Sequence, residues 1–96
     1  MSLTLTARER AHLKARAHAL EPVVQMGQAG LSEPFLVEVE RALTAHELIK
    51  VRMGSADRQA RADLTTALCD RTGAAAVQTV GKVLVLWRPR PEEPEV

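Results

Sequence analysis

The stretch VVQMGQAGLSEPF, residues 23–35, joins a short apolar run, two glycines three positions apart and a helix start. The run VVQM, residues 23–26, is typical of a short strand. Ser32 is a favoured N-cap residue, and apolar residues at helical spacing follow it. A strand, a tight loop and a helix are therefore predicted in succession. Gly27 and Gly30 have two explanations: a turn, or a backbone that a partner approaches closely.

Helix and strand patterns continue on both sides of this stretch. Thr6 and Glu9 form a capping box, and Gly73 is placed as a helix C-cap. The expected elements are a helix over residues 6–20, a strand over 23–26, a helix from Ser32, a strand over 48–53, a helix over 57–72 and strands over 74–80 and 83–88. This order predicts an α/β fold, a compact α-βαβαββ domain with a four-stranded mixed sheet. The last strand is apolar on both faces, so we expect it to be covered on both.

The composition is that of an ordinary globular domain. The chain has 96 residues, of which 46% are hydrophobic and 26% charged, and one domain commonly has about 100–200 residues. No apolar run approaches the roughly 20 residues that span a membrane. A single cysteine, Cys69, excludes an internal disulfide and favours a reducing compartment. We therefore expect a cytoplasmic protein without a membrane partner.

The charges are unevenly distributed along the chain. All 13 Lys and Arg residues but only nine of the 12 acidic residues precede residue 91, so residues 1–90 carry a net charge of +4. We predict a basic domain over residues 1–90 and an acidic, proline-rich, disordered tail over residues 91–96. A basic body permits a polyanionic partner.

The residues that often carry catalysis do not form a recognisable constellation. His12 and His18 are six positions apart, which places them on different helix faces and is not a metal-ligand spacing. His46 is better explained as a structural residue, and Cys69 as a buried, inert thiol. Dinucleotide-binding and P-loop motifs are absent. We expect no enzyme activity, no metal, no cofactor and no small-molecule substrate.

Nucleic-acid binding fits the sequence better. A Gly-x-x-Gly loop that opens onto a helix N-terminus offers backbone N–H groups and a favourable dipole to an anion. KH domains clamp a single-stranded backbone with such a loop. Aromatic residues make up only 2% of the chain, so base stacking cannot dominate. Contacts to phosphate and sugar are expected instead.

Three longer strings carry a family resemblance. AHALEPVVQMGQAGLSE, AHELIKVRM and GAAAVQTVGKVLVLWRP occur in this order and closely resemble the CRM domain (chloroplast RNA splicing and ribosome maturation), in particular its bacterial stand-alone, YhbY-like members. The resemblance covers about residues 3–89. It implies an RNA-binding domain whose fold is similar to the C-terminal domain of translation initiation factor three. Bacterial members are linked with precursors of the large ribosomal subunit.

The resemblance also implies an RNA-contacting loop, Gly27-Gln28-Ala29-Gly30. Relatives commonly have a lysine inside this loop, whereas Gln28 and Ala29 are neutral. Positive charge must then come from neighbouring residues. From residue type and expected exposure, the candidates are Arg10, Lys14, Lys50 and Arg52.

The resulting hypothesis is a non-catalytic, monomeric RNA-binding protein that binds ribosomal RNA in precursors of the large subunit. Two alternatives remain open at this point. The chain could be a protein-interaction module whose glycine loop is only a turn. It could also be a general translation-associated factor on mature ribosomes.

Overall fold

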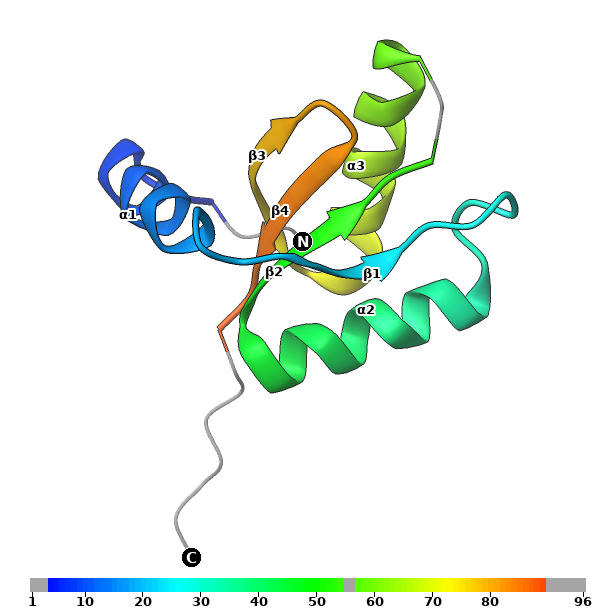
Figure 1. The fold of residues 1–96 in the computed structure, drawn as a ribbon, viewed down its shortest axis with the longest axis horizontal. Coiled ribbons are helices and arrows are strands. Elements are labelled where there is room, and N and C mark those ends of the chain that lie inside the picture. Colours follow the sequence, from blue (N-terminus) through cyan, green and yellow to red (C-terminus); the bar gives the residue numbers. More distant parts are fainter. Residues whose placement is uncertain (1–3, 55–56, 90–96) are drawn as a thin grey trace, which may run out of the picture.

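The helices and strands occur in the predicted order (Figure 1). The computed structural model describes residues 4–54 and 57–89. The elements are α1 (Ala7–Ala17), β1 (Pro22–Gln25), α2 (Glu33–His46), β2 (Leu48–Arg52), α3 (Arg58–Thr72), β3 (Ala75–Val80) and β4 (Val83–Trp87). The predicted α/β architecture is confirmed. The predicted acidic tail, residues 91–96, lies outside the described residues.

The strands form one mixed sheet in the order β1-β2-β4-β3. β1 and β2 are parallel, as expected for strands joined through α2, and β4 is antiparallel to both of its neighbours. β4 therefore lies inside the sheet. Its residues Leu84, Val85 and Leu86 are all buried, although successive side chains point to opposite faces. The apolar character of both faces of this strand is thus explained.

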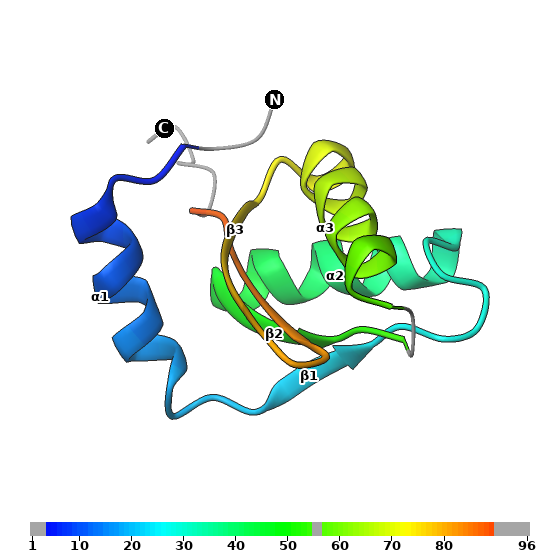
Figure 2. The same cartoon turned by 90° about the horizontal axis from the view of Figure 1, so that it is seen from above.

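Helices cover both faces of the sheet, but unequally (Figure 2). α2 and α3 pack on one face and enclose the larger hydrophobic cluster, which includes Ile49 and Val51 of β2. α1 lies on the other face, over a smaller cluster that contains Leu13, Ala17 and Leu48. The alternation predicted for residues 48–53 is confirmed, and it turns Lys50 and Arg52 toward the face that α1 covers only in part.

The ends of the helices follow the local sequence signals, with one exception. Thr6 and Glu9 form the predicted capping box. Gly73 ends α3 in the left-handed conformation, with φ 73°. α1, however, ends at Ala17 and not at Leu20. The Leu20 N–H donates to Ala17 O in a turn, at 2.9 Å. Pro22 also disfavours helical backbone at the residue immediately before it.

Candidate nucleic-acid interface

The loop between β1 and α2 is a tight turn that leads directly into a helix. The Gly30 N–H donates to Gly27 O at 3.1 Å, and Gly30 has a φ of 67°. Ser32 Oγ accepts a hydrogen bond from the Phe35 N–H at 3.3 Å, which confirms Ser32 as the N-cap of α2. The loop and the helix start are therefore built by local interactions.

The two glycines of the loop differ in what the fold requires of them. Gly30 needs its left-handed φ for the turn, a conformation that residues with a Cβ rarely adopt. Gly27 has no positive φ, and a Cβ built on it meets no heavy atom within 4 Å. The turn thus accounts for Gly30 alone. At Gly27 the described part of the chain offers no steric reason to avoid a side chain.

The exposed part of the loop presents backbone donors. Gln28 and Ala29 are exposed, and in the described part of the chain their N–H groups have no protein acceptor. The positive end of the α2 dipole lies just behind them. Glu33, the first residue of α2, places a carboxylate at this end, 3.6 Å from the Arg71 guanidinium. Both of these side chains are well exposed.

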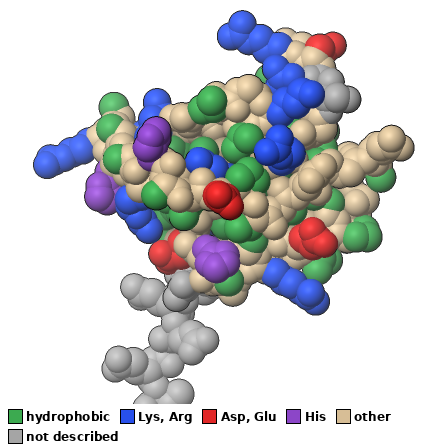
Figure 3. All heavy atoms as spheres, in the orientation of Figure 1, with side chains coloured by type: hydrophobic (Ala, Val, Ile, Leu, Met, Phe, Trp, Pro, Cys, Tyr) green, Lys and Arg blue, Asp and Glu red, His purple; other side chains and the backbone are tan. Residues whose placement is uncertain are grey.

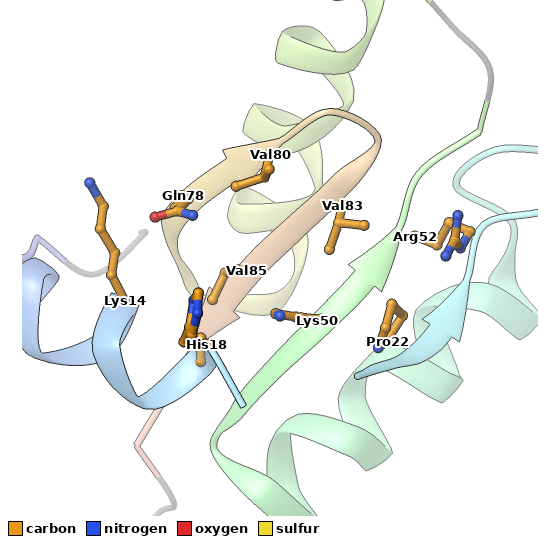
Figure 4. Close-up of a pocket in the computed structure, with 10 residues that line it drawn as sticks. Lys14, His18, Pro22, Lys50, Arg52, Gln78, Val80, Val83 and Val85 are labelled. Carbon is orange, nitrogen blue, oxygen red and sulfur yellow. The ribbon is translucent and has the colours of Figure 1, made fainter. Parts of the chain in front are cut away.

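A groove of about 430 Å³ opens between the C-terminal part of α1 and the sheet (Figure 4). Lys14 of α1 and His18, the C-cap residue of α1, line one side, and Lys50 and Arg52 of β2 line the other. None of the described residues that line this α1–sheet groove is acidic. Figure 3 shows Lys and Arg side chains on both sides of a hydrophobic area on this face. The groove is thus a cationic hollow between two elements.

The groove brings together three of the four nominated cations, Lys14, Lys50 and Arg52. The Lys50 ammonium extends toward the end of α1 and donates to Leu20 O at 2.8 Å. An ammonium has three donors, so this bond leaves others for a ligand. His18, which the sequence hypothesis did not include, joins them because it lies one helical turn after Lys14.

Arg10 has a different environment from the one expected. It is half-buried, and its guanidinium donates to Ala76 O and, at 2.9 Å, to Val77 O of β3. The register of β3 against β4 shifts at this point, between Ala76 and Gln78. Arg10 therefore fastens α1 to an irregular stretch of an edge strand. The expected exposure of this side chain was wrong, because a partner 66 residues away in sequence cannot be read from local pattern.

Arg52 connects the groove to the glycine loop. It pairs with Gln25 in the sheet, and its carbonyl accepts from the Met26 N–H at 2.8 Å, one residue before Gly27. The hairpin residue Lys82 reaches the same end of the sheet, where its carbonyl accepts from the Met53 N–H at 2.6 Å. Sequence reasoning missed Lys82, since its position depends on β4 lying next to β2.

Cys69 and the histidines are the residues considered for catalysis. Cys69 is buried in the larger cluster, and burial, followed by the negative charge of Asp70, raises the pKa of its thiol. A neutral thiol is a poor nucleophile. Within residues 4–54 and 57–89, no group of three or more His, Cys, Asp or Glu side chains is placed to hold a metal. No helix of the described chain has the length and apolar character needed to cross a membrane.

Comparisons with known proteins agree with the fold. A Haemophilus influenzae protein named as an RNA-binding protein is 47% identical over 93% of this chain and 90% of its own. A Pseudomonas aeruginosa protein, named as a probable RNA-binding protein, is 38% identical over 94% of this chain and 86% of its own. The solution structure of a hypothetical protein from Staphylococcus aureus superposes with a TM-score of 0.82, at 28% identity, over 97% of both chains.

The family resemblance drawn from the three sequence strings is confirmed by a family model. That model, the CRS1 / YhbY (CRM) domain, matches residues 5–88. The match includes the glycine loop, the strand β2 that carries Lys50 and Arg52, and all of α1 and the sheet. The chain belongs to the CRS1/YhbY (CRM) domain family.

Proposed function

We propose that this protein is a non-catalytic RNA-binding protein whose contact surface combines the Gly27–Gly30 loop with the cations of the α1–sheet groove. One observation carries the proposal. The Haemophilus influenzae relative, 47% identical over 93% of this chain, is named as an RNA-binding protein. So close a relationship over almost the whole domain makes a shared class of ligand the simplest expectation.

The geometry of the surface supports binding to the RNA backbone. The N–H groups of the exposed residues Gln28 and Ala29 can donate to phosphate oxygens, and Gly27 leaves room for a close approach. Lys14 and Arg52 supply charge that the neutral loop lacks. Because the chain has only 2% aromatic residues, phosphate and sugar contacts dominate and sequence selectivity is weak.

The finer part of the proposal concerns the target. The protein acts as a monomer in the cytoplasm, where it binds ribosomal RNA in precursors of the large ribosomal subunit. The support for this part is the resemblance to the bacterial stand-alone members of the family, which are linked with such precursors. The net charge of +4 over residues 1–90 is compatible with ribosomal RNA as the ligand.

Two measurements test the proposal. Fluorescence anisotropy gives the affinity for labelled fragments of large-subunit RNA, and gradient fractionation locates the protein among ribosomal particles. We expect affinity for the naked RNA and sedimentation with large-subunit precursors. Sedimentation with mature ribosomes would point to a general translation-associated factor. No affinity for RNA, together with retention of a ribosomal-protein partner, would point to a protein-interaction module.

A further inference from the structure

We propose that the α1–sheet groove is a second RNA subsite that holds one unpaired nucleotide. The inference rests on the RNA-binding function proposed above and specifies which form of RNA the surface selects. It is carried by three features of the groove: cations on opposite sides, a partly exposed aliphatic floor, and continuity with the glycine loop.

Cationic side chains lie on both sides of the groove. Lys14 lies on the α1 side, and Lys50 and Arg52 lie on the β2 side. In Figure 4 Lys50 points toward the end of α1, whereas Lys14 and Arg52 point outward along the rim. Like charges that line one hollow repel one another, and a bound anion reduces this repulsion. No acidic side chain among the described lining residues competes for them. The groove is therefore complementary to a negatively charged ligand.

The floor between these cations is aliphatic. Val80, Val83 and Val85 line it. Val80 is 58% exposed and Val83 is half-buried, whereas Val85 is buried beneath them. Simple anions, such as inorganic phosphate, gain nothing from this surface. A nucleotide does, because the apolar face of its base and one side of its ribose can cover the valines while its phosphate meets the cations. Gln78, which projects from β3 toward α1, adds an amide that can donate to and accept from a base edge.

The size of the groove selects an unpaired nucleotide. Its volume of about 430 Å³ lies within the range of about 300–1,000 Å³ that is usual for small-ligand sites. A base inside a duplex is stacked and paired, so its face cannot reach the valine floor. Duplex RNA can contact the rim cations only through its phosphates. The preference for single-stranded over duplex RNA therefore comes from contact with the valine floor and not from contact with the cations.

One RNA strand can occupy the groove and the loop together. β1 begins at Pro22, which lines the groove, and Gly27 follows five residues later. At about 3.3 Å per residue, this path is about 17 Å long. Arg52 lies beside this path, because it pairs with Gln25 in the sheet. A strand of several nucleotides that follows β1 would place one nucleotide in the groove and a phosphate near the loop.

The test compares two RNAs and two kinds of change. The full chain is titrated with a labelled 12-nucleotide single strand and with a blunt duplex of the same sequence. Val83→Ser removes part of the floor without changing charge. We expect it to weaken single-strand binding roughly fivefold, as for the loss of a few tens of square ångströms of apolar contact, and to leave duplex binding and the salt slope unchanged.

Lys14→Ala removes a cation without changing the floor. We expect both RNAs to bind less tightly, and the single-strand salt slope to become shallower by about 0.7, the value for one lost phosphate contact. Two variants serve as matched controls. Val37→Ser changes an exposed valine on α2, and Arg16→Ala removes an exposed cation of α1 that does not line the groove. Each control should change single-strand affinity less than twofold. Thermal melts confirm that each variant is folded.

A titration of the unchanged protein, followed by ¹H–¹⁵N NMR, keeps the test independent of variant stability. With the single strand, the amides of Lys14, Val80 and Val83 should shift together with those of Gln28 and Ala29. Shifts confined to the loop, or unchanged single-strand affinity in a folded Val83→Ser protein, would overturn the groove inference and leave RNA binding through the loop intact. No shift and no affinity with either RNA would overturn the proposed function as well.

Discussion

Replacing the two loop glycines separately distinguishes a turn from a site of close approach. Gly30 has a left-handed φ of 67°, whereas Gly27 has no positive φ and has open space around its missing Cβ. An alanine at position 30 should cost about 1–2 kcal/mol of stability, the price of left-handed backbone for a residue with a Cβ. An alanine at position 27 should be neutral, or stabilising by about 0.4–1 kcal/mol, because it restricts the unfolded chain.

These stability differences are large enough to measure. For a domain of this size, 1 kcal/mol corresponds to about 4–8 °C in Tm. We therefore expect Gly30→Ala to melt several degrees below the parent and Gly27→Ala to melt at or above it. RNA affinity should not follow this order of melting temperatures. Gly27→Asp places a carboxylate where the phosphate approaches and should weaken binding at least tenfold, or about 1.4 kcal/mol.

Thermal melts and RNA anisotropy on the same samples provide the assay. Thr66→Asp is the matched control, because it adds the same charge at an exposed position on α3, a helix that packs on the sheet face opposite the groove. It should not change RNA affinity. If Gly27→Asp is folded and binds RNA as tightly as the parent does, close approach at the loop is wrong, and the fold would then offer no explanation for Gly27.

Four further outcomes are expected. With roughly four phosphates engaged on single-stranded RNA, log K against log salt should have a slope of about −3, and a flat response would exclude a phosphate-dominated interface. Glu33→Gln should strengthen RNA binding about twofold to threefold, because the carboxylate lies at the helix end that faces the phosphate; weaker binding would contradict this geometry. Arg10→Met should lower stability by about 1–3 kcal/mol, because two half-buried β3 carbonyls lose their charged donor. An unchanged melting temperature would show that the hydrogen bonds from Arg10 to β3 contribute little to stability. Burial raises the pKa of Cys69, so the contribution of the neutral thiol to stability is complete below the ordinary thiol pKa of about 8.5 and is lost as pH rises through the raised value. Cys69→Ala should remove this loss of stability at alkaline pH, cost about 1 kcal/mol or less, and leave RNA binding unchanged. Loss of RNA binding in a stable Cys69→Ala protein would reopen a functional role for the thiol.

Features that depend on neighbours in sequence were predicted well. Ser32 and Phe35 form the N-cap contact that the start of α2 requires. The alternation of residues 48–53 placed Lys50 and Arg52 together on one face. Lys14 was nominated only from residue type and expected exposure, and its place beside them depends on how α1 packs on the sheet. These predictions rest on side-chain periodicity, which is two residues in a strand and 3.6 residues in an α-helix wherever these elements form. They were sufficient for the architecture and for the shared face of Lys50 and Arg52.

Features that depend on pairing between distant strands were not predicted. Arg10 satisfies carbonyls where β3 loses its regular register, and this irregularity leaves no local signal. In the sequence, Val80 and Val83 look like any other strand residues. They form part of the groove floor because α1 does not extend over the β3–β4 hairpin. The difference between Gly27 and Gly30 likewise needs the three-dimensional backbone conformation, since both residues have the same identity and similar surroundings in sequence.

The unequal attachment of the helices has a consequence for amide hydrogen exchange. α2 and α3 enclose the larger cluster, whereas α1 is held by the smaller one and by the bonds of Arg10 and Lys50. Elements with fewer buried apolar contacts open at lower free energy. α1 should therefore detach and exchange its amides before the sheet opens. A strand of RNA held between Lys14 and Arg52 would join α1 to β2, so bound RNA should slow exchange in α1 more than in α3.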